Sequence, residues 1–132
     1  MRKRRTKLEW KESPDIQRRI KELLVLRDFA HICADRVFCY ESTGANTRAC
    51  ARIWGFNRLW QQTLNLPPAY ILEVVLERFG KLSIIQQDHV LIHELLHIPK
   101  NFSGALVSHR KKGGVNEKMV REVYEALYFS RR

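Results

Sequence analysis

Five residues, His93-Glu-Leu-Leu-His97, have the types and the spacing that metal chemistry needs. On a helix, positions i and i+4 share one face about 5–6 Å apart at Cβ, so both imidazoles could bind one ion. Glu94 is rotated by about 100° from His93, so its carboxylate can reach a water at the metal without being a ligand. This pattern is typical of a catalytic zinc site in which the glutamate is the general base.

A third ligand is needed, because a catalytic zinc ion usually has three protein ligands and one open position. His89 would lie about 12 Å from His97 along a helix, too far to share the ion, so we expect it to pack against or support the site. His109 follows Pro99 and Gly104, where a loop can fold back over the helix end, which makes it the better candidate. A carboxylate from the last helix is the other possible ligand. Those candidates are Glu117, Glu122 and Glu125.

Glu94 lies in an apolar segment, and a buried carboxylate costs free energy unless it has a partner or a task. We therefore expect Glu94 to take a proton from the attacking water and pass it to the leaving amine. The reaction also needs a group that stabilises the oxyanion. The candidates for this role are Tyr124, Tyr128 and Arg110.

The motif must sit on a helix, and its neighbours predict one. Ser83 and Gln86 form a capping-box pattern, and helical apolar spacing continues from Ile84 to about His97. Its apolar residues cover more than one stripe, so this helix should be largely buried. Pro99 ends it. A last helix is expected from about Asn116 to Tyr128.

The remaining segments predict one more helix and two strands. Ser13-Pro14-Asp15 is a helix start, and the apolar spacing after it could extend this helix as far as Tyr40. Residues 51–57 and 69–76 are rich in β-branched and aromatic residues, which favours strands. The Pro67-Pro68 pair before the second strand favours an edge position, where a peptide could add as a further strand.

The composition fits one small globular domain, with 45% hydrophobic and 29% charged residues. No apolar run is long enough to span a membrane, and no apolar segment follows the basic N-terminus. We therefore expect no membrane segment, no secretory signal and a cytoplasmic location. Three irregularly spaced cysteines predict reduced thiols, with a Cys39–Cys50 bridge as the alternative. The expected division is a basic arm, residues 1–12, and a single domain, residues 13–132.

Basic residues outnumber acidic ones by 24 to 14, which gives a net charge of +10. They cluster in Arg2–Lys7, in His109–Lys112 and at Arg131-Arg132. A basic surface attracts phosphate-rich or acidic partners. Nucleic acid is therefore a possible partner of the arm, although solvated tails have the same composition.

The chain resembles the phage metallopeptidase family of archaea and their viruses in two features. These are the segment from His93 to Gly104, which contains Ile-Pro and Phe-Ser-Gly, and the downstream His109. The resemblance covers about residues 51–109, including Ile53-Trp-Gly and Leu66-Pro-Pro-Ala-Tyr. It implies a zincin-like fold in which zinc is the cofactor. The implied ligands are His93, His97 and His109, with Glu94 as catalytic acid and base. The layout is more loosely similar to SprT-like proteases, because His-Arg rather than His-Gly stands at 109–110.

These observations predict an α+β, zincin-like fold. Its small mixed sheet should have an edge strand packed on the motif helix, with N- and C-terminal helices beside it. The expected activity is hydrolysis of peptide bonds in a protein or peptide substrate by a zinc-activated water. The alternatives are a nucleic-acid-binding protein with a structural metal, and a DNA-associated protease that combines both. A structural zinc is normally closed by four ligands, often cysteines, so the irregular cysteines favour the enzyme. The oligomeric state is not predictable.

Overall fold

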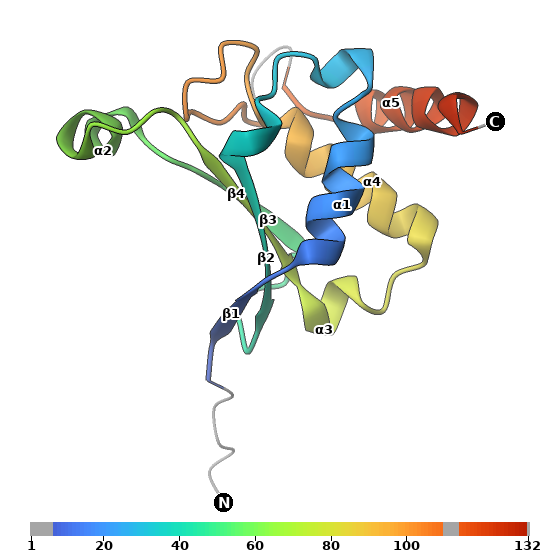
Figure 1. The fold of residues 1–132 in the computed structure, drawn as a ribbon. Coiled ribbons are helices and arrows are strands. Elements are labelled where there is room, and N and C mark those ends of the chain that lie inside the picture. Colours follow the sequence, from blue (N-terminus) through green and yellow to red (C-terminus); the bar gives the residue numbers. More distant parts are fainter. Residues whose placement is uncertain (1–6, 110–113, 132) are drawn as a thin grey trace, which may run out of the picture.

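The computed structural model of the protein describes residues 7–109 and 114–131. The strands and helices lie in the order β1 (Glu9–Glu12), α1 (Pro14–Leu23), η1 (Arg27–Phe29), η2 (Ala34–Arg36), β2 (Val37–Thr43), β3 (Ala51–Gly55), α2 (Arg58–Leu64), β4 (Tyr70–Val75), α3 (Leu76–Phe79), α4 (Ile84–Leu96) and α5 (Glu117–Ser130). Helices α1, α4 and α5 lie on one side of a single sheet (Figure 1). The predicted α+β class with a small mixed sheet is confirmed.

The sheet has the strand order β1-β2-β4-β3. The β2 and β4 strands are parallel, whereas β1 and β3 pair antiparallel to their neighbours. The prediction that residues 69–76 form an edge strand is therefore wrong, because β4 is paired on both sides. Pro67 and Pro68 precede β4 rather than interrupt its ladder, so they cost it no hydrogen bond. The edge strand packed against α4 is β3.

The first helix is shorter than its apolar spacing suggests. It starts at Ser13 as predicted, with the Ser13 hydroxyl accepting a bond from the Ile16 amide, but it ends at Leu23. Residues 37–43 form β2, in which buried Val37 and Cys39 alternate with exposed Phe38. A period of two on a paired strand therefore replaces the helical period that the sequence also allowed.

The segment assigned to the basic arm also contributes to the sheet. Residues 9–12 form β1, which pairs with β2. Residues 1–6 of that arm lie outside the described residues. The three cysteines are free, so the alternative of a Cys39–Cys50 bridge is wrong. Within the described ranges, no helix is both long and apolar enough to cross a membrane.

Helix α4 is fixed in the middle of the helical layer. The predicted capping box is present, with Ser83 and Gln86 each bonding the backbone amide of the other. Leu91, Ile92 and Leu95 have no measurable exposure. On the same helix, the buried Asp88 carboxylate pairs with Arg19 of α1 at 3.0 Å and with Arg131 after α5 at 3.3 Å. These contacts hold the helix that carries the motif against both of its neighbours.

Candidate metal centre

Three imidazoles meet at the C-terminal end of α4. The Nε2 atom of His93 lies 3.3 Å from that of His97 and 2.8 Å from that of His109. The three ligand nitrogens all lie within 4.8 Å of one another, and this is the single group of its kind among the described residues. His93 lies on α4, His97 is the C-cap residue of that helix four positions later, and the loop after it supplies His109. The structure thus brings together the three histidines that the resemblance implied.

Two of the three nitrogen separations can be compared with those around one tetrahedral ion. Zinc binds imidazole nitrogen at about 2.0–2.1 Å, so two ligands at a tetrahedral angle stand about 3.3 Å apart. The His93–His97 separation has this value, and the His93–His109 separation is shorter by 0.5 Å. His97 is buried, His93 is partly buried and His109 is exposed, so the group opens to solvent on one side. Three nitrogen donors with one open side are what a catalytic zinc site requires.

A backbone pair orients the His97 ring. Its Nδ1 atom contacts the carbonyl oxygen of Val107, and the Val107 amide donates to the His97 carbonyl at 2.7 Å. A ligating histidine usually donates its other ring nitrogen to such a carbonyl, which fixes the tautomer and turns Nε2 toward the metal. The same two bonds tie the loop before His109 to the end of α4. Sequence reasoning missed this role of Val107, because a backbone contact leaves no residue-type signal.

The loop that carries His109 is anchored to the sheet by a buried tyrosine. The hydroxyl of Tyr70, at the start of β4, accepts a bond from the Gly104 amide and donates to the Ala105 carbonyl, both at 2.8 Å. The Tyr70 ring also packs against Phe102 at a centroid distance of 5.0 Å. From α2, the Gln61 amide group donates to the carbonyl of Ser103 at 2.8 Å. These contacts determine where the loop returns over α4.

Two glycines allow the same loop to lie directly on β3. A Cβ atom at Gly55 would meet the Gly104 carbonyl oxygen at 2.1 Å, and one at Gly104 would meet the Phe56 carbonyl oxygen at 2.1 Å. Gly104 also has a φ of +94°, a conformation that side chains disfavour. The two sequence stretches quoted for the resemblance, around 53–55 and 102–104, therefore touch each other in space. Nothing in one sequence signals that pairing.

The protein environment favours the neutral form of two of the three imidazoles. Burial lowers the pKa of His93, and so do the neighbouring rings of His97 and His109, while Glu117 acts in the opposite direction. Burial also lowers the pKa of His97, against the effect of the Val107 carbonyl. A neutral imidazole has a free lone pair, so a lowered pKa favours metal binding at neutral pH.

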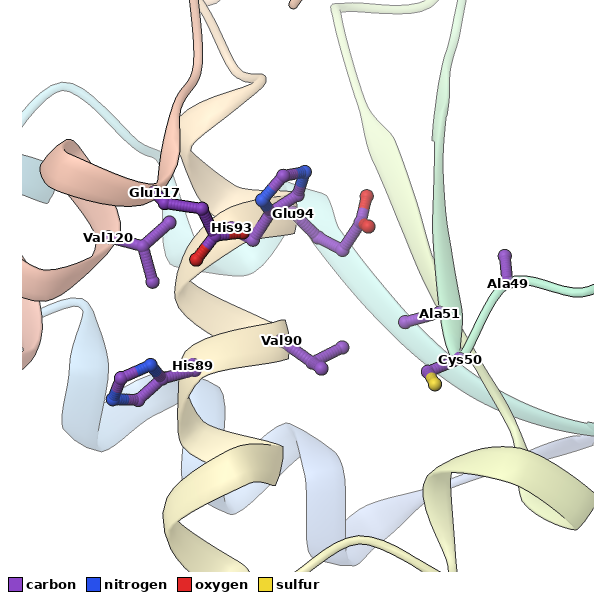
Figure 2. A pocket seen from close by; sticks show the side chains of 9 residues that line it. All are labelled: Ala49, Cys50, Ala51, His89, Val90, His93, Glu94, Glu117 and Val120. Atoms are coloured by element: carbon purple, nitrogen blue, oxygen red, sulfur yellow. The ribbon is translucent and has the colours of Figure 1, made fainter.

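Glu94 faces a cleft beside this group. The cleft has a volume of about 280 Å³ and lies between α4, α5 and the start of β3. Its lining residues are shown in Figure 2: Ala49, Cys50, Ala51, His89, Val90, His93, Glu94, Glu117 and Val120. The Glu94 side chain extends from α4 toward β3, away from Glu117 and Val120 of α5 (Figure 2). Burial raises the pKa of its carboxyl group to about 7, which suits proton transfer in both directions near neutral pH.

The other candidates from the sequence take different places. His89 lines the cleft but lies outside the metal group, and its ring packs at a tilt against Tyr124 with a centroid distance of 4.5 Å. Glu117 lies near enough to His93 to influence its pKa but is not part of that group. Tyr128 is 55% exposed and packs against Phe129, away from the cleft-lining residues. The remaining carboxylates of α5, Glu122 and Glu125, also stand apart from the metal group. Arg110 lies outside the described residues.

Comparison with known families agrees with the geometry. The family model described as "Putative phage metallopeptidase" matches residues 8–126. The chain belongs to this family. The match takes in all four strands and the three clustered histidines, so it extends well beyond residues 51–109, where the resemblance was first apparent. No curated protein and no solved structure matches the chain. The phage metallopeptidases are by name metal-dependent peptidases, and the looser likeness to SprT-like proteases stays a prediction.

Proposed function

We propose that the protein is a zinc-dependent peptidase, with His93, His97 and His109 as the metal ligands and Glu94 as the general base. The observation that carries this proposal is the convergence of three Nε2 atoms beside a carboxyl group whose pKa is raised to about 7. A structural zinc would normally be closed by a fourth protein ligand. Among the described residues the group holds three histidines and no cysteine, which supports the catalytic interpretation.

Each residue has a defined task in this proposal. When bound, zinc polarises the scissile carbonyl and lowers the pKa of water. Glu94 accepts a proton from the attacking water and returns it to the departing amine. The contact with Val107 holds the His97 ring in the tautomer that leaves Nε2 free. The cleft between α4 and β3 gives room for a substrate carbonyl next to Glu94.

The edge of β3 is the best place for an extended peptide. β4 cannot accept another strand, because β2 and β3 already pair with it. No described strand pairs with the outer edge of β3, and this strand packs against α4. A peptide added there would make main-chain bonds and run past Glu94. The strand-addition hypothesis therefore moves from residues 69–76 to β3.

The decisive experiment compares wild type with Glu94→Gln. We expect the variant to bind zinc with unchanged stoichiometry, measured by elemental analysis, and to lose about 10²–10⁴-fold in the rate of cleavage of an unstructured protein such as casein. Glu122→Gln, at an exposed position on α5, is the matched control and should cleave at the wild-type rate. A Glu94→Gln variant as active as wild type, or a wild-type protein that cannot be loaded with zinc, would contradict the proposal.

A further inference from the structure

The face of the sheet that points away from the helices carries an unusual set of exposed aromatic side chains. Figure 1 shows α1, α4 and α5 on the opposite side, and within the described residues no helix packs over this face. The registers place Trp10 opposite Ser42, and both Phe38 and Trp54 opposite Ile71. Trp10, Phe38 and Trp54 are 57%, 42% and 47% exposed. We call the following residues the aromatic face: Trp10, Phe38, Tyr40, Trp54 and Ile71.

The aromatic face is hollowed into a shallow apolar groove. A groove of about 450 Å³ is lined by Trp10, Tyr40, Trp54, Ile71 and the buried Glu73. A second hollow of about 360 Å³ adjoins it, since Trp54 and Ile71 line both. Residues two apart on one strand lie roughly 7 Å from each other, so Phe38 and Tyr40 present separate rings rather than one packed cluster. Separate, accessible ring faces are suited to stacking with flat ligands.

The buried carboxylate of Glu73, in the middle of the aromatic face, is compensated by its neighbours. Arg52 pairs with the Glu73 carboxylate at 2.9 Å, and the Trp54 indole donates to the same carboxylate at 2.9 Å. Burial alone would raise the pKa of the Glu73 carboxyl, but these bonds hold it below its ordinary value. The Arg52 guanidinium lies 5.1 Å from the Trp54 ring. The middle of the face is therefore close to neutral, with its one buried carboxylate compensated.

Positive charge stands at the two ends of the aromatic face. At one end, Arg36 lies 5.7 Å from the Phe38 ring, donates to the carbonyls of Pro67 and Pro68, and pairs with no described carboxylate. At the other end the exposed Lys7 lies two residues before β1, which carries Trp10. The exposed carboxylate of Glu12 is the one described negative charge on this face that has no partner within ion-pair distance.

We propose that the aromatic face binds single-stranded nucleic acid, with bases stacked on its rings and phosphates held by Arg36 and Lys7 at its two ends. Aromatic platforms flanked by positive charge are the general means by which proteins hold unpaired strands. Duplexes fit poorly, because their bases are already stacked and would leave the rings without partners. A second copy of this chain fits poorly as well, since each copy carries a net charge of +10. The proposal adds a binding site on the side of the sheet away from the metal centre.

Fluorescence anisotropy with the full chain tests the proposal. The probes are a labelled 20-nucleotide oligothymidylate and a duplex of equal length, each at two salt concentrations. We expect the single strand to bind more tightly than the duplex, with an affinity that falls as salt rises. Trp10→Ala and Phe38→Ala should each weaken binding by about fivefold or more, the loss expected for one stacked base. Trp60→Ala is the matched control, because Trp60 on α2 is 54% exposed but lines neither hollow.

A second readout does not depend on alanine variants that keep their fold. In a Trp60→Phe background the remaining tryptophans are Trp10 and Trp54, and their fluorescence should be quenched when oligothymidylate binds. Absence of binding would overturn the proposal. Binding that neither Trp10→Ala nor Phe38→Ala weakens, with tryptophan fluorescence that oligothymidylate does not change, would overturn it in favour of the basic N-terminal segment alone. A dimer that Trp10→Ala dissociates, or binding to anionic vesicles in preference to the oligonucleotide, would also overturn it. Peptidase activity is not measured, so this test and that of the proposed function can fail separately.

Discussion

Glu94→Gln should change the stability of the metal-free protein in a way that depends on pH. Burial raises the pKa of the Glu94 carboxyl to about 7 from an ordinary value of 4.5. Between these two values the folded chain keeps a proton that the unfolded chain releases. Stability is therefore lost as pH rises through this window, because ionisation favours the unfolded state. Glutamine has nearly the same shape but does not titrate, so the variant should not lose stability in this way as pH rises.

The magnitude follows from the size of the pKa shift. A shift of one unit corresponds to about 1.36 kcal/mol, so a shift of about 2.5 units gives about 3 kcal/mol. The free energy of unfolding of Glu94→Gln, relative to wild type, should rise by about this amount between pH 4.5 and pH 7 and stay constant above. His93 and His97 also titrate, but both proteins contain them, so their contributions largely cancel in the difference.

Urea unfolding at several pH values, in the presence of a strong chelator, measures this difference directly. Glu122→Gln is the control, because it makes the same chemical change at an exposed position on α5. A stability difference for Glu94→Gln that stays flat between pH 4.5 and pH 8 would refute the desolvation argument. A difference that falls with rising pH would show that an unrecognised positive charge stabilises the carboxylate.

Three further predictions test the metal centre and the sheet. Zinc should raise the melting temperature of the wild-type protein, and a concentration of 100 times Kd should stabilise it by about 2.7 kcal/mol. The melting temperature of His97→Ala should not rise with zinc. Thermal scans at increasing zinc concentrations measure both. Tyr70→Phe should weaken zinc binding by the same factor at every pH, as measured by chelator competition, because it removes two loop contacts and no titrating ligand. Arg52→Met should destabilise the fold by about 3–5 kcal/mol in urea, since it leaves the buried Glu73 charge without its cation, and adding Glu73→Met should recover most of that loss.

The parts of the site that depend on local sequence were predictable. The capping box, the i, i+4 histidines and Pro99 all act within one or two helical turns, so spacing alone indicated α4 nearly to its ends. Strand β3 and the last helix were likewise placed to within about two residues by their local composition. Local rules of this kind are independent of what the segment packs against.

The errors came where packing decides between local preferences. Apolar residues at 29–40 satisfied a helical period, yet the chain forms β2 there because pairing with β1 and β4 buries Val37 and Cys39. The pair Pro67-Pro68 suggested an edge, but strand order is a property of the whole sheet and is not encoded near one strand. The contacts of Tyr70 and Gly55 with the 102–105 loop join segments more than thirty residues apart, for which a single sequence carries no signal.

The third ligand couples the metal centre to the sheet. His93 lies on α4, and His97 is its C-cap residue with a ring that the Val107 carbonyl orients, whereas His109 is placed by a loop whose position depends on Tyr70. Loss of loop contacts reduces the fraction of molecules in which all three rings are in place, and apparent affinity falls by that fraction. Acidification acts differently, because protons compete with the metal for His93 and His97, and the lowered pKa values of these two rings move that competition to lower pH. The two effects multiply, so plots of log affinity against pH for wild type and Tyr70→Phe should be parallel. Curves that converge at low pH would mean that the loop is itself organised by histidine protonation.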